Sequence, residues 1–224
     1  MSYKIRHIKE HLMLDADEGL WVLDTGAPSS FGSVNKLEIH DQSYEIASNY
    51  LGFDNEKLSE ALGKNVEGLI GGDILNNYDS YWDLSSNRIS FSTENMGNGG
   101  TAIPLRFFMG IPTLKVNMQG SSYNWFFDTG AVICYVTEQI EEWEAPVDTY
   151  DDFYPGYGNF STEVFEDEII LGTLNMKIKC GVLPSLLGMS LAVADCTGIL
   201  GLSALGQKSF LYAPRRKKLI LTAQ

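Results

Sequence analysis

The chain has 224 residues, of which 44% are hydrophobic and 20% charged, the balance of a globular protein with enough apolar side chains for a core. Its net charge of −13 at pH 7 argues against a nucleic acid partner, whose phosphates it would repel, and against docking on an anionic membrane. No apolar run reaches the roughly 18–20 residues that a transmembrane helix needs.

The N-terminal residues and the cysteines indicate a cytoplasmic protein. The first eleven residues lack the apolar centre of a secretory signal peptide. Cys134, Cys180 and Cys196 are too few, and odd in number, for the disulfide framework of a secreted domain. We therefore expect a cytoplasmic location.

The chain begins with a pattern of strands and turns. Residues 3–14 predict one or two strands, and the polar residues 15–19 predict a turn. Residues 20–23 then form an apolar strand that ends abruptly in Asp24-Thr25-Gly26. Alone, these three residues would indicate an ordinary turn, because Asp and Gly are common turn formers.

Further elements follow in the first half. Residues 37–46 alternate as a short hairpin around 40–42. Residues 54–63 predict a helix, with Asp54 as its N-cap and Gly63 as its C-terminal stop. An apolar strand opening with Gly68 comes next, followed by a predicted helix at 73–78 and a strand at 88–91.

A polar, Gly-rich run at 92–101 is the clearest linker in the chain. After it the pattern restarts, with a strand at 111–118, a turn at 119–122 and a strand at 123–127. This last strand ends at Asp128, just as the strand at 20–23 in the first half ends at Asp24.

The two halves repeat each other. Residues 21–27 (Trp-Val-Leu-Asp-Thr-Gly-Ala) recur 104 positions later as Trp-Phe-Phe-Asp-Thr-Gly-Ala, and residues 68–75 are echoed by 198–205. The echo continues downstream, where Tyr81 corresponds to Leu211. Two copies favour a pair of lobes related by a pseudo-two-fold axis, in which one chain mimics a symmetric dimer.

Asp-Thr-Gly-Ala after an apolar strand, followed later by two apolar residues and a Gly, resembles the pepsin/retropepsin clan of aspartic peptidases. The amino-acid sequences of the motifs are similar to those of retropepsins, and the arrangement of two lobes in one chain is similar to that of pepsin. The resemblance implies a mainly β, bilobal acid protease fold with a few short helices. It divides the chain into an N-terminal lobe (1–96), a linker (97–103) and a C-terminal lobe (104–224).

The resemblance also implies the site and its chemistry. Asp24 and Asp128 would form a catalytic dyad that shares one proton and activates water to hydrolyse a peptide bond, with no covalent intermediate, metal or cofactor. The hydroxyls of Thr25 and Thr129 would bond across to the opposite loop. Gly26 and Gly130 would let the backbone approach the carboxylates closely.

One difference between the halves indicates a flap. From Asp24 to Gly71 there are 47 positions, whereas from Asp128 to Gly201 there are 73. The surplus includes residues 151–165, two aromatic-rich arms around Pro-Gly-Tyr-Gly that predict a long hairpin. In the family such a hairpin closes over bound peptide, although pepsin carries it on the first lobe. An ordinary surface hairpin remains the alternative.

The resemblance to this clan also suggests roles for some single residues. Tyr157 is the predicted substrate-contacting residue at the hairpin tip, ahead of Tyr154 and Phe160. Asp73 matches an acidic position that is structural in retropepsins. Cys134 follows the second motif and either lines the cleft or is a small buried side chain. The three histidines show no metal-binding spacing.

Three hypotheses follow for the function. The first is an active aspartic endopeptidase that acts on peptides or proteins as a monomer. The second is a proteolytically silent fold that binds peptides or proteins, motivated by the short first lobe and its missing flap. The third is an obligate homodimer of these chains. Aspartates in both lobes favour the first hypothesis.

Overall fold

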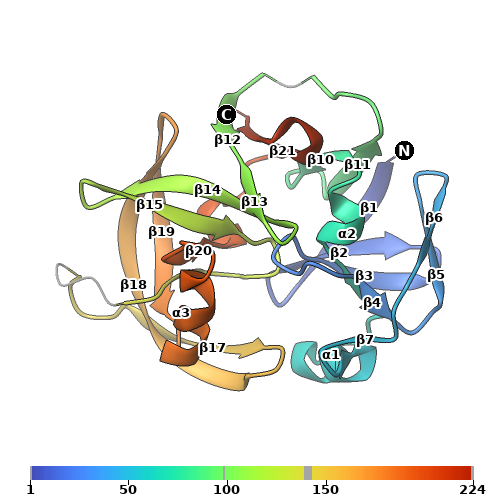
Figure 1. The fold of residues 1–224 in the computed structure, drawn as a ribbon, viewed down its shortest axis with the longest axis horizontal. Coiled ribbons are helices and arrows are strands. Elements are labelled where there is room, and N and C mark those ends of the chain that lie inside the picture. The colour runs from blue at the N-terminus through green and yellow to red at the C-terminus, as the bar shows by residue number, and fades with distance from the viewer. Residues whose placement is uncertain (1, 98, 139–142, 223–224) are drawn as a thin grey trace.

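A computed structural model describes residues 2–97, 99–138 and 143–222 of the chain. The protein is mainly β and forms two lobes, which lie on the right and left of Figure 1, each built around one large sheet. The predicted all-β, bilobal fold class is therefore confirmed. Within the described ranges, no helix has the length and apolar character needed to cross a membrane.

The larger sheet contains most of the first half of the chain. Its ten strands, in spatial order, are β12 (Thr101–Pro104), β22 (Lys218–Leu221), β21 (Phe210–Ala213), β10 (Asp79–Asp83), β11 (Arg88–Ser92), β1 (Ser2–Ile8), β2 (His11–Ala16), β3 (Gly19–Leu23), β9 (Gly68–Ile70) and β4 (Phe31–Gly32).

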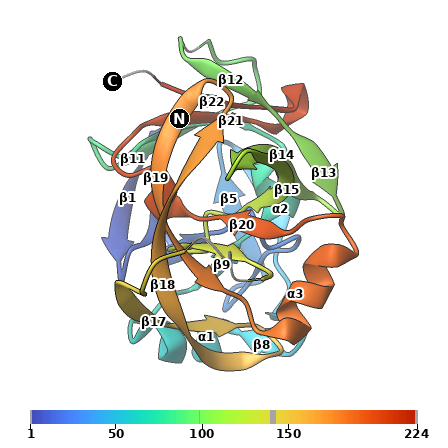
Figure 2. The same cartoon turned by 90° about the vertical axis from the view of Figure 1, so that its left-hand side faces the viewer.

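The second sheet belongs wholly to the second half, and Figure 2 shows its two longest strands curving along that lobe. Its eight strands, in spatial order, are β13 (Arg106–Phe108), β14 (Ile111–Met118), β15 (Ser121–Phe127), β20 (Gly198–Leu200), β16 (Cys134–Val136), β19 (Leu174–Val182), β18 (Gly158–Leu171) and β17 (Asp148–Tyr154).

The remaining elements are short. Two hairpins form separate two-stranded sheets, namely β5 (Lys36–Ile39) with β6 (Gln42–Glu45) and β7 (Asn49–Tyr50) with β8 (Phe53–Asp54). The helices are α1 (Asn55–Leu62), α2 (Gly72–Leu75) and α3 (Ser185–Ala192), with 3-10 turns at Leu202–Ala204 and Pro214–Arg216.

Local sequence signals explain several of these elements. The Asp54 side chain accepts a hydrogen bond from the Lys57 N–H at 3.0 Å, and Gly63 ends helix α1 at a φ of 60°. Of the one or two strands predicted at 3–14, the structure forms two, because Lys9 and Glu10 turn the chain with positive φ. The helix predicted at 73–78 is shorter, and helix α2 covers only Gly72–Leu75.

The two halves of the chain are joined within the larger sheet. Strand β12 begins within the predicted linker, and β21 and β22 follow it in sequence, but all three complete the sheet of the first lobe. Strand β10 pairs with β21 in the register Ser80–Tyr212, Tyr81–Leu211 and Trp82–Phe210. The pseudo-two-fold axis passes through the middle pair, because the repeat equates Tyr81 with Leu211. The domain boundaries stay predictions, and residue 98 of the linker lies outside the described residues.

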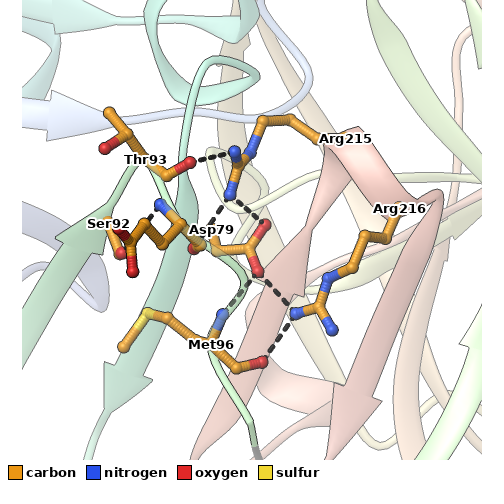
Figure 3. A network of polar contacts seen from close by, with 7 residues as sticks. Asp79, Ser92, Thr93, Met96, Arg215 and Arg216 are labelled. Carbon is orange, nitrogen blue, oxygen red and sulfur yellow. Dashed lines mark hydrogen bonds and ion pairs between the residues drawn. The ribbon is translucent and has the colours of Figure 1, made fainter.

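A buried carboxylate reinforces this junction, as Figure 3 shows. Asp79 of β10 is inaccessible to solvent, with its Oδ1 3.1 Å from the Arg215 guanidinium and its Oδ2 2.5 Å from that of Arg216. The N–H of Met96 donates to the same carboxylate at 2.9 Å. Asp79 thus holds the chain after β11 and the C-terminal 3-10 turn against one strand of the first lobe.

Candidate active site

Strands β3 and β15 carry the two Asp-Thr-Gly loops and place them at equivalent points. Both strands end in three buried apolar residues, and each pairs in parallel with a buried partner, β3 with β9 and β15 with β20. The Asp24 N–H donates to the Ile70 carbonyl at 3.0 Å, and the Asp128 N–H donates to Leu200 at 3.1 Å. Each aspartate is therefore fixed at the end of a rigid strand.

Two buried threonines lock the loops together. The Thr25 N–H donates to Thr129 Oγ1 at 3.0 Å, and the Thr129 N–H donates to Thr25 Oγ1 at 3.0 Å. Each hydroxyl then donates to a carbonyl of the opposite strand, Thr25 to Phe127 at 2.8 Å and Thr129 to Leu23 at 2.9 Å. Each hydroxyl thus accepts one hydrogen bond and donates one. These reciprocal bonds align the loops about the pseudo-two-fold axis.

Gly26 and Gly130 bring each loop against the opposite carboxyl group. A Cβ added to Gly26 would lie 2.3 Å from the carboxyl carbon of Asp128, and one added to Gly130 would lie 2.5 Å from that of Asp24. No side chain fits in that space, so glycine is required at both positions. The two carboxyl groups consequently face each other across the glycines.

Backbone N–H groups orient each carboxyl group. Asp24 Oδ1 accepts from the N–H groups of Gly26 and Ala27 at 2.8 and 2.9 Å. Asp128 Oδ1 accepts from those of Gly130 and Ala131 at 2.7 and 3.2 Å. The second oxygen of each group is left for the other aspartate or for a bound molecule.

The environment raises the pKa of both carboxyl groups. Burial raises the pKa of Asp24 well above its usual value, and the nearby charge of Asp128 and the hydrogen bond between the two groups raise it further. Burial also raises the pKa of Asp128, while its hydrogen bonds with Asp24 and the loop N–H groups act in the opposite direction. Both residues keep partial contact with solvent, so water can reach the pair.

The long hairpin of the second lobe crosses over to the first lobe. Strands β17 and β18 pair from Asp148–Val164 to Tyr154–Gly158, and Figure 1 shows the hairpin running toward α1. The ring of Phe153 stacks on Phe53 of β8, with ring centres 4.8 Å apart. Burial raises the pKa of Tyr154, and the charges of Asp128 and Asp24 raise it further. The hairpin therefore contacts the first lobe and brings Tyr154 within electrostatic range of the two aspartates.

Two further side chains, which the sequence did not identify, interact with the region of the two carboxyl groups. Half-buried His11 opens strand β2, and its burial lowers the pKa of its imidazole, against the raising effects of Asp152, the Gly130 backbone and Asp128. Asp152 belongs to the hairpin and accepts a hydrogen bond from the Tyr135 hydroxyl. No local motif marks these residues, because elements far apart in sequence bring them together.

The residues singled out from the sequence have distinct locations. Tyr157 lies at the exposed tip and packs edge-on against Phe160, with ring centres 6.1 Å apart, so Tyr154 is the tip tyrosine that lies close to the carboxyl groups. Asp73 accepts from the Ser30 N–H and hydroxyl at 2.9 and 2.6 Å, a structural arrangement. Cys134 is fully buried, and burial raises the pKa of its thiol to about 12.

A cavity of about 880 Å³ adjoins this region without including the aspartates. Glu10 and Leu12 of the first lobe line one side of it, and Val132 and Leu202 of the second lobe line another. The cavity therefore lies between residues of the two lobes, and Val132 follows Gly130 by two positions in the chain.

Among the residues that the structure describes, no group of three or more His, Cys, Asp or Glu side chains could hold a metal ion. The groups that can perform chemistry at the loops are the two carboxyls themselves. Together they offer a base, an acid and a water-accessible space between them.

No protein-family model matches the sequence, and neither does any curated protein. Among solved structures, one match is the crystal structure of a retropepsin-like aspartic protease from Rickettsia conorii. The match has 18% identity and a TM-score of 0.36, and it covers 56% of this chain and 96% of that one. At this identity and TM-score we base no assignment on the likeness.

Proposed function

We propose that the chain is an aspartic endopeptidase that hydrolyses peptide bonds with Asp24 and Asp128. The observation that carries the proposal is the pair of carboxyl groups, each packed against the glycine of the opposite loop, between two loops that the threonines lock together. Two like charges so close cannot both ionise at low cost, so the pair retains one proton. A pair that holds one proton contains both the base and the acid that amide hydrolysis needs.

The proposed reaction begins with a water molecule held between the carboxyl groups. The ionised carboxyl takes a proton from the water as its oxygen attacks the carbonyl carbon, and the protonated carboxyl gives its proton to the carbonyl oxygen. The resulting gem-diol collapses when one carboxyl protonates the amide nitrogen, the C–N bond breaks, and the other carboxyl accepts the hydroxyl proton. The pair again holds one proton, which we assign to neither residue alone.

The hairpin β17–β18 is proposed to be the flap over a bound peptide. Its Phe153 rests on the first lobe, which positions Tyr154 near the dyad. In the first lobe the short hairpin β5–β6 packs inward instead, with Leu37 and Ile39 buried and the Tyr44 hydroxyl 2.6 Å from that of Tyr78. A single flap from the second lobe would therefore cover the peptide, with Tyr157 as a further substrate contact.

Each chain carries a complete dyad, so we propose that one chain is the catalytic unit. The three cysteines are free and buried, so the described fold uses no disulfide. The cytoplasmic location expected from the sequence stays a prediction.

The test is cleavage of a mixed peptide library between pH 3 and pH 7. We expect the wild type to cleave, a statine-type mimic of the gem-diol to block it, and Asp24→Asn and Asp128→Asn each to abolish cleavage. Asp195→Asn is the matched control, because this exposed aspartate has a φ of 55°, a conformation that asparagine tolerates. A folded wild type that is silent at every pH would contradict the proposal and favour the peptide-binding alternative.

A further inference from the structure

Tyr135 contacts both arms of the hairpin β17–β18. It lies on strand β16 and is only 2% exposed. Its hydroxyl donates a hydrogen bond to Asp152 of β17, and its ring packs against Phe160 of β18, with ring centres 6.0 Å apart. Asp152 and Phe160 are paired directly across the hairpin. One buried side chain therefore holds a single pair of residues on the two arms.

This pair lies just beyond the point where the hairpin leaves the sheet. Strand β18 pairs with β19 as far as Val164, and the Thr162 hydroxyl accepts from the Val182 N–H at 2.9 Å. Nearer the tip, among the described strands, β18 pairs with β17 alone. Tyr135 is thus the next attachment of the hairpin to the body of the second lobe.

The repeat in the sequence shows that the hydroxyl of Tyr135 is specific to the second lobe. The residue 104 positions earlier is Phe31. Each lies opposite the middle residue of a buried strand, Phe31 opposite Leu69 and Tyr135 opposite Ile199. The first lobe accommodates phenylalanine at this position, so the fold does not require the hydroxyl there.

Asp152 lies among several titratable groups. Its Oδ1 accepts from the Phe153 N–H at 2.7 Å, and its Oδ2 accepts from Tyr135, so both oxygens have a donor. The titratable groups that face it are, besides Tyr135, His11 of β2, Asp128 of the second loop and Tyr150 of its own strand, with Glu10 beside His11 and Tyr150.

The charge of Asp152 acts on the dyad. Burial raises the pKa of Asp128, and the charge of Asp152 raises it further. Burial lowers the pKa of His11, so its imidazole is uncharged over more of the pH range and compensates the charge of Asp152 less.

We propose that Tyr135 and Asp152 are positioning residues of the active site. Their hydrogen bond holds the hairpin in place and keeps the carboxylate of Asp152 beside Asp128. The inference rests on the proposed function, because it takes the hairpin to be the flap over a bound peptide. Both residues act through the hairpin and the dyad and not on the reacting atoms.

Amide hydrogen exchange of Tyr135→Phe tests the hydrogen bond. Exchange of residues 150–160 should speed up several-fold, because the arm that carries Asp152 loses its attachment. The variant should fold, since phenylalanine occupies the equivalent position 31. Tyr150→Phe is the matched control, because it removes a hydroxyl from the same arm that hydrogen-bonds to no described residue. Exchange in Tyr135→Phe equal to that of the wild type would overturn the proposal.

Peptide cleavage separates positioning from simple stabilisation. In Tyr135→Phe the KM should rise several-fold while kcat changes less, because the covering hairpin is loosened. Asp152→Asn keeps an oxygen that can accept from Tyr135, so its exchange and KM should stay close to those of the wild type.

The lost charge of Asp152→Asn should appear in the pH profile. Without that charge the pKa of Asp128 falls, so the dyad loses its proton at a lower pH. The high-pH limb of kcat/KM should therefore move to lower pH. A limb that does not move would show that Asp152 is not held beside Asp128 and would overturn the proposal.

A double-mutant cycle tests whether the two residues act as a pair. Asp152→Ala should speed up exchange as much as Tyr135→Phe does, and the double variant should show no further increase. Increases that add would show two separate roles. Exchange needs no activity, so a wild type that cleaves no peptide would contradict the proposed function while exchange still decides the role of this hydrogen bond.

Discussion

The side chains of Thr25 and Thr129 form hydrogen bonds with backbone groups of the opposite loop and strand, with which no described strand of the opposite lobe pairs. Each hydroxyl accepts from the N–H of the other threonine and donates to a carbonyl of the opposite strand. Because all these groups are buried, the loss of one hydroxyl leaves two backbone groups without partners.

Replacing Thr25 with Val should therefore destabilise the protein by about 2–4 kcal/mol, because the Thr129 N–H and the Phe127 carbonyl lose their partner in a buried site. Thr25→Ser keeps the hydroxyl and should cost only about 1 kcal/mol for the missing methyl group. Urea unfolding measures both. Equal losses for the two variants would show that the hydroxyl bonds do not hold the loops.

The raised pKa values of Asp24 and Asp128 predict how stability depends on pH. The folded state holds its protons to a higher pH than the unfolded chain does, so between the two pKa ranges it binds more protons. The dyad's contribution to stability is complete below the unfolded pKa near 4 and is lost as pH rises through the raised folded pKa.

Asp24→Asn removes this dependence because asparagine does not titrate. Relative to the wild type, the variant should gain stability steadily from about pH 4 to pH 7, with its smallest advantage near pH 3. Urea unfolding at each pH gives the comparison. Wild-type and variant stabilities that stay parallel across this range would show that the pair does not retain a proton.

The sequence signal for these candidate residues is contiguous. Asp, Thr and Gly stand together in each loop, so one repeated motif singles out six candidates, which the structure brings together. His11 and Asp152 interact with the same region, but they come from β2 and β17, which tertiary packing brings to the loops. No spacing in the sequence encodes that proximity.

At the scale of elements, the hairpin β17–β18 is held to the first lobe by one stacked aromatic pair. Phe153 and Phe53 lie at 23° to each other, and Phe153 packs against the cluster that contains Leu58 of α1. Such a pair contributes about 0.5–1.5 kcal/mol beyond its buried area. The hairpin can therefore detach at modest cost.

Phe153→Ala should release the hairpin without unfolding the protein. Amide hydrogen exchange of residues 150–160 should speed up several-fold, and the KM for peptide should rise more than kcat falls, because the covering contact is lost. Tyr157→Ala is the control for exchange, since the ring of Tyr157 packs on Phe160 of the same hairpin. Unchanged exchange in Phe153→Ala would place the anchor elsewhere.

The helices show why elements differ in predictability. Residues 54–63 contain an N-cap, a C-terminal glycine and one apolar face, all local signals, and α1 forms there. Helix α3 has neither cap nor contrasting faces, so its stretch gave no prediction. Its only local signal is the pair Leu187 and Leu191, four positions apart, and packing in the second lobe stabilises it.

For the whole molecule, the larger sheet and the Asp79 network join the two halves of the chain. Strands β12, β21 and β22 belong to the first lobe's sheet although they come from the second half. This arrangement was not predicted from the sequence. A polar, glycine-rich run indicates a segment without regular secondary structure, but it does not indicate with which sheet the following strands pair.

Asp79→Asn should lower the free energy of unfolding by about 1–3 kcal/mol, because Arg215 and Arg216 lose the charge that they share and remain about two-thirds buried. Lys36→Gln, in the exposed pair with Glu45, should change it by no more than about 0.5 kcal/mol. Urea unfolding compares the two, and similar effects would show that the Asp79 network does not join the halves.

The pairing of Tyr81 with its own counterpart Leu211 places a two-fold axis through the molecule, and the long hairpin β17–β18 of the second lobe breaks that symmetry. A site with perfect two-fold symmetry would accept a peptide equally well in either direction, because turning the chain end for end would meet the same groups. If the hairpin is the proposed flap, the two ends of the site differ. Under the proposed function, the polarity of the bound peptide is therefore fixed by the lobe that carries the hairpin, and the residues on the two sides of the cleaved bond are recognised by different surfaces.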